Sequence, residues 1–134
     1  MGSPREGGCQ CGSVRYRLED EPLGLAACHC TDCQRQSGSA FGMSLAVPVA
    51  SFRLLSGELK KFTAMCDSGR TKDCAFCPSC GTRIYHQGNE AALSIKPGTL
   101  DDTSWLDPDA HYWIKSKQPW VPIPGGVRCV EDDG

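Results

Sequence analysis

Short segments in which apolar and polar residues alternate make up much of the chain. Val14, Tyr16 and Leu18 alternate with arginines, and a second stretch, 41–47, alternates apolar with small residues. A period of two is typical of strands that have one buried face. Further strands are predicted at 59–64, 75–77, 82–86, 91–95 and 112–115.

The pattern favours one short helix. No window carries an apolar stripe of helical period over more than about two turns. The best candidate begins near Thr31 or Asp32, either of which could cap it, and ends before Gly38. Fifteen glycines and nine prolines suit tight turns between short strands. The sequence therefore predicts a mainly β fold with one short helix after the Cys28–Cys33 group.

Length and charge restrict the class of protein. The 134 residues are expected to form one domain, 7–124, between a flexible N-terminus, 1–6, and a C-terminal tail, 125–134. Fourteen basic and sixteen acidic residues without a basic run make nucleic acid an unlikely partner. No segment approaches the roughly 20 apolar residues of a membrane span, and 1–8 lack the layout of a signal peptide. We expect a cytoplasmic protein with no membrane partner, whose oligomeric state the sequence leaves undetermined.

Ten cysteines are the strongest chemical signal in the chain. Without an export signal they should stay reduced, and clustered reduced thiols are more often metal ligands or catalytic groups than disulfides. Seven of the ten fall into three tight groups: Cys9 with Cys11, Cys28 with Cys30 and Cys33, and Cys77 with Cys80.

The Cys77–Cys80 pair has the form of a zinc knuckle. Pro78 and Gly81 favour a tight turn that directs both sulfurs to one ion. A structural zinc takes four ligands, so a second pair is needed, and Cys9 with Cys11 can supply it. The alternative is that those two are ordinary thiols near a turn.

Cys28, Cys30 and Cys33 then remain without a partner pair. Three thiolates on a zinc leave one position vacant, which is the arrangement of a catalytic site. His29 lies between two ligands and should point away from the metal in an extended backbone, toward a supporting or packing role. A closed site stays open as an alternative if a fourth ligand comes from Cys66, Cys74, Cys129, Asp32 or His29; the first three are otherwise buried or incidental thiols.

Five ordered motifs resemble one known family. They are GGCQCGSVRY, CHCTDCQRQSGSAFG, SGRTKDCAFCPSCGTRIYH, IKPGTLDD and HYWIKSKQPWV, and they extend over 7–121. Together they resemble the glutathione-dependent formaldehyde-activating enzymes, whose domain is shared with centromere protein V. The resemblance implies a zinc-containing β-tent of packed antiparallel sheets. It also implies two zinc ions, a structural one on Cys9, Cys11, Cys77 and Cys80 and a catalytic one on Cys28, Cys30 and Cys33.

The activity implied by the resemblance is that of a carbon-sulfur lyase. Glutathione and formaldehyde would condense reversibly to S-hydroxymethylglutathione, or another thiol and aldehyde would react in the same way. Glutathione carries two carboxylates, so a basic residue is expected near the pocket, with Arg35 as first candidate and Arg70 and Lys72 as second choices. The donor to the developing alkoxide is undetermined among Thr31, Ser37, Ser39 and His29. The alternative function is a non-catalytic zinc module that binds protein or nucleic acid.

Overall fold

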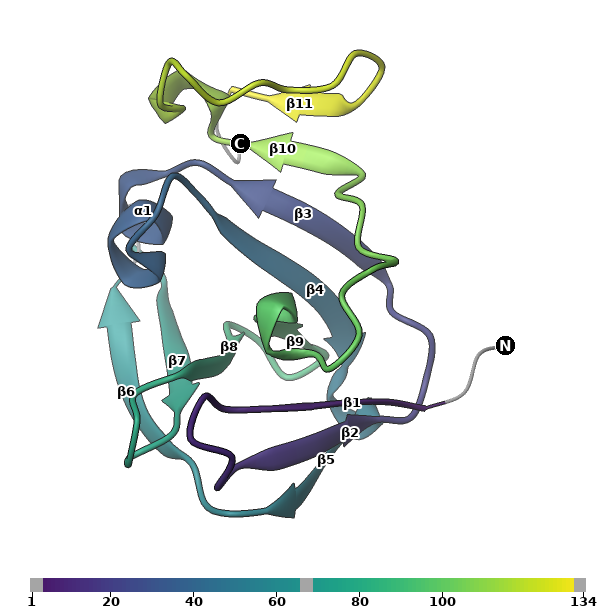
Figure 1. Ribbon diagram of the computed structural model, residues 1–134. Coiled ribbons are helices and arrows are strands. Elements are labelled where there is room, and N and C mark those ends of the chain that lie inside the picture. Colours follow the sequence, from purple (N-terminus) through teal and green to yellow (C-terminus); the bar gives the residue numbers. More distant parts are fainter. Residues whose placement is uncertain (1–3, 66–68, 132–134) are drawn as a thin grey trace.

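The computed structural model describes residues 4–65 and 69–131 as a mainly β structure of two sheets with one α-helix (Figure 1). The predicted fold class is thus confirmed. The helix is α1 (Thr31–Ser37). The smaller sheet has the order β1 (Arg5–Gly8), β2 (Arg15–Leu18), β5 (Phe52–Ser56). The larger sheet has the order β11 (Arg128–Val130), β10 (Ala110–Tyr112), β3 (Gly24–Cys28), β4 (Gly42–Pro48), β9 (Ala92–Ile95), β8 (Arg83–Gln87), β7 (Thr71–Phe76), β6 (Lys60–Met65).

The core lies between the two sheets. Tyr16 of β2 is fully buried and stacks on Phe52 of β5, with ring centroids 5.3 Å apart. Phe52 in turn meets Tyr85 of β8 edge-on at 5.2 Å, which joins the small sheet to the large one. Leu45 and Ile95, opposite each other on β4 and β9, complete this apolar face. Because side chains alternate along a strand, the other face of the large sheet carries different residues, and α1 packs against it through β4.

The helix begins and ends close to its predicted bounds, but its cap was predicted wrongly. Gly38 closes it in the left-handed conformation, with φ of 63°. The N-cap is Cys30, whose Sγ accepts the N–H of Cys33 at 3.3 Å, so Thr31 is already helical. Cys33 therefore lies inside the helix and not before it.

The C-terminal part of the sheet differs most from expectation. The strand predicted at 112–115 ends at Tyr112, because Trp113 adopts φ of 59° and a 3-10 turn, Ile114–Ser116, follows. β10 pairs in parallel with both β3 and β11, so the large sheet is mixed and not antiparallel throughout. Strands β1, β3, β5 and β11 were not predicted, and β7 begins at Thr71, before the predicted start of its segment at 75.

Strand pairing also extends beyond the proposed domain limits. β1 begins at Arg5 and pairs with β2, and β11 lies within the segment expected to be a tail. The boundary 7–124 remains a prediction. Among the described residues, α1 has seven residues, and no helix there is long and apolar enough to span a membrane.

Candidate metal centre and active site

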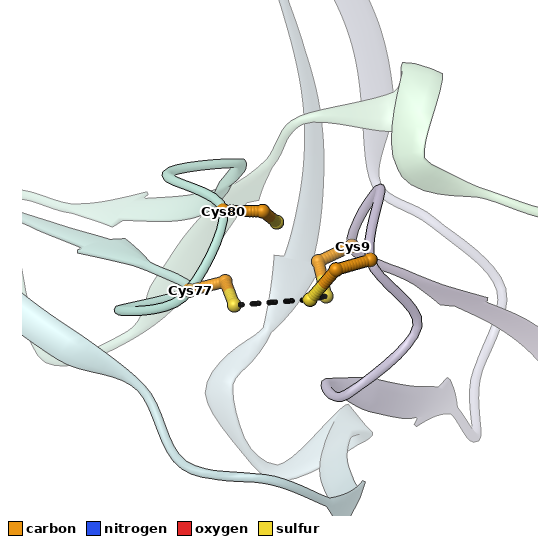
Figure 2. A group of neighbouring side chains, drawn as sticks. Cys9, Cys77 and Cys80 are labelled. Carbon is orange, nitrogen blue, oxygen red and sulfur yellow. Dashed lines mark hydrogen bonds between the residues drawn. The ribbon is translucent and has the colours of Figure 1, made fainter.

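Four cysteine sulfurs meet where the turn after β1 faces the turn between β7 and β8. Cys77 and Cys80 point from one loop toward Cys9 in the other (Figure 2). With Cys11, these four Sγ atoms all lie within 4.8 Å of one another. The Cys9–Cys11 and Cys11–Cys77 separations are 3.6 and 3.8 Å, much longer than a disulfide bond of about 2 Å. In a tetrahedron with metal–sulfur bonds of about 2.3 Å, neighbouring sulfurs lie about 3.8 Å apart, so this group fits a tetrahedral ion.

Backbone and hydroxyl donors around this group favour ionised sulfur. The N–H of Val14 donates to Cys9 Sγ at 3.2 Å, and the Thr82 hydroxyl lies 3.2 Å from Cys80 Sγ. Burial raises the pKa of Cys9, but hydrogen bonds led by that of Val14 outweigh it and lower the pKa to about 7. Hydrogen bonds from Thr82 lower the pKa of Cys80 to about 5. Metal ligation requires thiolates, and these hydrogen bonds stabilise Cys9 and Cys80 in that form before an ion binds.

The second group is built where β3 passes into α1. Cys28 is the last residue of β3, Cys30 caps the helix and Cys33 lies in its first turn. Their Sγ atoms lie within 4.8 Å of one another, and no fourth Cys, His, Asp or Glu joins them within 4–65 and 69–131. The thiols of Cys28 and Cys33 hydrogen-bond to Cys30 and lower its pKa, and the same contacts raise the pKa of Cys28. One thiol thus ionises easily, while full ionisation of the group needs a cation to replace the remaining protons.

Two nitrogen donors lie beside the three-cysteine group, over Gly42 of β4. A Cβ placed on Gly42 would lie 2.8 Å from Nε2 of Gln36 and 3.5 Å from Nζ of Lys96. The same position is 3.3 Å from Cβ of Cys33. Nε2 of Gln36 is buried and has no hydrogen-bond partner among the described residues. Burial lowers the pKa of Lys96, and its proximity to Cys33 partly offsets that effect. A side chain at this position would displace the Gln36 amide, so the glycine leaves room for it beside Lys96.

His29 lies on the opposite side of the backbone from the sulfurs that flank it. Its side chain is fully buried, and Nε2 lies 2.9 Å from Nδ1 of His111 on β10. The two rings stack with centroids 5.2 Å apart. Burial, and then the charges of His111 and Lys117, lower the pKa of His29. This contact fixes β10 to the cysteine loop.

A profile of the glutathione-dependent formaldehyde-activating enzymes matches residues 4–116, well over half of the chain. The chain belongs to this family. The fold is also similar to the crystal structure of a Rhodobacter sphaeroides protein solved by structural genomics, with a TM-score of 0.57 and 21% identity over 77% of this chain and 91% of that one. A comparison with curated protein sequences found no match. Membership of the family agrees with glutathione and formaldehyde as the small molecules involved, and either cysteine group could hold a metal ion.

The remaining candidate residues lie at different distances from this centre. Arg35 of α1 is exposed and lines two surface pockets, and Lys72 of β7 lines one of them. Arg70 is exposed before β7. Ser37 and Ser39 both donate to the Phe41 carbonyl. Neither Cys74, which is buried, nor Cys129, which is exposed on β11, joins a metal-ligand group in the described part of the chain, and Cys66 lies outside it.

Sequence reasoning missed Gln36 and Lys96. Lys96 follows the strand predicted at 91–95 and keeps its period, two residues after Ser94, directly before Pro97. The alternation of Lys96 with the apolar residues of this strand could therefore be recognised in the sequence. The face of the strand that meets the cysteines could not be recognised, because it depends on the pairing of β9 with β4.

Proposed function

We propose that the four-cysteine group holds a structural zinc ion and that the three-cysteine group holds a second, catalytic one. Four thiolates at tetrahedral spacing satisfy zinc completely, whereas three leave a position for a substrate. Sulfur-rich ligand sets favour zinc over magnesium or calcium, which prefer oxygen. The structural ion would connect the β1–β2 turn to the β7–β8 turn. Reduced ligands of this kind require a reducing compartment, which supports a cytoplasmic location.

We further propose that the protein is a carbon-sulfur lyase-type enzyme that condenses glutathione with formaldehyde to S-hydroxymethylglutathione, reversibly. A zinc ion held by Cys28, Cys30 and Cys33 would keep an incoming thiol in its thiolate form at neutral pH. The thiolate sulfur forms a bond to the aldehyde carbon, the C=O π bond breaks, and the oxygen takes up one proton. The reverse reaction breaks the same carbon-sulfur bond. The observation that carries this proposal is the incomplete thiolate group in a member of this family.

The side chains over Gly42 have the chemistry to handle the developing alkoxide. Nε2 of Gln36 is a buried donor in need of an acceptor, and Nζ of Lys96 can donate a hydrogen bond and offset negative charge. Both act from the side of Cys33. Nε2 of His29 is engaged by Nδ1 of His111, while its buried Nδ1 has no hydrogen-bond partner among the described residues. Ser37 and Ser39 are occupied by the Phe41 carbonyl at the far end of the helix.

The test combines metal content with exchange kinetics. Two-dimensional exchange NMR measures interconversion of glutathione and S-hydroxymethylglutathione against the fast spontaneous reaction. We expect the wild type to bind two zinc ions and to accelerate exchange. Cys30→Ser should lose the acceleration and one labile ion, while Cys129→Ser, which removes an exposed thiol outside both groups, should change neither.

Three outcomes would contradict the proposal. Equal exchange rates with and without the protein would favour the non-catalytic zinc module. Two equally inert, closed sites would count against a vacant position. Loss of the second ion in Cys66→Ser would show that Cys66 closes the site.

A further inference from the structure

Both peptide groups that join Cys28 to Cys30 are held by hydrogen bonds from outside the cysteine group. The N–H of His29 belongs to the first peptide group and donates to the Tyr112 carbonyl of β10 at 2.9 Å. The carbonyl of His29 belongs to the second and accepts from Nε2 of Gln34 on α1, also at 2.9 Å. Because a peptide group is rigid and planar, holding both planes fixes φ and ψ of His29. The separation and relative orientation of the two flanking cysteines are fixed with them.

The amide of Gln34 is itself held on every side. Its Nε2 also donates to the Ser116 carbonyl, at 3.0 Å, and only the NH2 end of an amide can face two carbonyls. Its Oε1 accepts from Nε2 of Gln118 at 3.1 Å. Oε1 of Gln118 in turn accepts from the indole N–H of Trp120 at 2.6 Å. Rotation of the Gln34 side chain would therefore break three hydrogen bonds at once, including the one to the cysteine loop.

The backbone at Trp113 shows that the C-terminal segment is constrained to make these contacts. Trp113 lies between Tyr112 and the turn Ile114–Ser116, which present the two carbonyls that accept from the cysteine loop and from Gln34. It has φ of 59° and ψ of 40°, and it is the one non-glycine residue with positive φ in the described ranges 4–65 and 69–131. A bulky residue keeps this disfavoured conformation only where its surroundings over-determine it.

We propose that Gln34 is a positioning residue for the three-cysteine group and that Gln118 holds it in place. The segment 112–118 thereby sets how firmly, and in what geometry, this group holds an ion. The inference rests on the proposed function, since it assumes an ion on Cys28, Cys30 and Cys33. Gln34 acts through the backbone of His29 and not by contact with the ion or a substrate. Hydrogen-bonding partners that orient metal ligands typically change metal affinity by about 10–100-fold.

The experiment loads the full chain with cadmium, so that cadmium NMR gives a resonance for each cysteine group, and measures zinc release to a chromophoric chelator separately. Gln34→Met keeps the length of the side chain and removes the amide. We expect it to shift or broaden the resonance of the three-cysteine group, which Cys30→Ser assigns. Release of the more labile zinc ion should be about tenfold faster or more. The resonance and the release rate of the four-cysteine group should stay as in wild type.

Gln87→Met is the matched control. Gln87 of β8 is also half-buried, and its Nε2 also donates to a backbone carbonyl, that of Asn89 at 3.0 Å, outside this network. This variant should leave both resonances and both release rates unchanged. Gln118→Met should act in the same direction as Gln34→Met but by a smaller factor, because Gln34 keeps its own two donations.

A general loosening of the fold would accelerate the release of both ions together, and that result would overturn the proposal. So would equal release of the labile ion from Gln34→Met and Gln87→Met. If circular dichroism shows that Gln34→Met does not fold, Gln118→Met takes its place under the same criteria. If wild type holds a second, labile ion that is insensitive to these substitutions, only this inference fails. If wild type holds no second ion, the proposed function fails and takes this inference with it.

Discussion

Mild acid should destabilise the protein through His86. This side chain is only 6% exposed on β8, and its Nε2 accepts a hydrogen bond from Arg83. Burial, followed by the charges of Lys96, Lys72 and Arg83, lowers its pKa to about 3. In the unfolded chain a histidine has a pKa of about 6.5. The folded protein therefore holds His86 neutral over a range in which the unfolded chain takes up a proton.

The direction of the effect follows from proton binding. Between pH of about 6.5 and 3 the unfolded chain binds more protons at His86 than the folded chain, so the free energy of unfolding falls as the pH is lowered. The contribution is complete above pH of about 6.5 and is lost progressively down to about 3. Between pH 7 and pH 5 the expected loss from this one group is about 2 kcal/mol.

Urea denaturation of wild type and His86→Gln at pH 7, 6 and 5 isolates this contribution. Glutamine can still accept from Arg83 but does not titrate. Protonation of the zinc ligands affects both proteins alike, so the difference between their unfolding free energies is the quantity to follow. We expect it to change by about 2 kcal/mol between pH 7 and 5, in the direction that favours the variant at low pH. Parallel curves for the two proteins would refute the buried neutral imidazole.

Three further substitutions test the metal centre and the core. Cys80→Ser should lower bound zinc from two ions to one and reduce the melting temperature, since binding free energy on the order of 10 kcal/mol is coupled to folding in such sites; elemental analysis showing two ions would contradict the assignment. Gly7→Ala should destabilise by about 1–3 kcal/mol or more, because its Cβ would press on the Thr99 carbonyl and lie 2.7 Å from the Tyr16 hydroxyl; an unchanged urea midpoint would show that β1 can move. Ile84→Ala should cost about 2–5 kcal/mol in the same assay, as Ile84 is fully buried in the apolar core; a loss below about 1 kcal/mol would mean that the core closes around the cavity.

Local signals explain what could be predicted from the sequence. Alternation identified β2, β4 and β9, because each has one apolar face against the core. The predicted segments also located β6, which is largely exposed, and β8, which is buried at three consecutive residues. Close spacing of the cysteines, with turn-forming residues beside them, allowed the thiol groups to be predicted. Strands β3 and β5 were not predicted because their alternation of apolar and polar residues is weak. β3 is rich in alanine, and β5 has exposed leucines at 54 and 55.

The rest depends on long-range pairing, which one sequence does not reveal. Lys72, Arg83 and Lys96 come together because β7, β8 and β9 are neighbours, and α1 covers the face that they share. The cap of α1 was missed for a different reason. Cys30 was considered only as a ligand, whereas its sulfur also accepts the N–H of Cys33. One side chain thus serves both the helix and the candidate site.

The sequence separation within the four-cysteine group has a consequence for biosynthesis. Cys11 and Cys77 are 66 residues apart, so the first pair of thiols leaves the ribosome long before the second. At roughly 5–20 residues per second the interval is about 3–13 s, during which Cys9 and Cys11 have no closing partners. We expect nascent chains arrested before Cys77 to be readily alkylated at both thiols, and chains released after Cys80 to be protected when zinc is present. The N-terminal hairpin would therefore be the part of the newborn protein most sensitive to oxidants and zinc shortage.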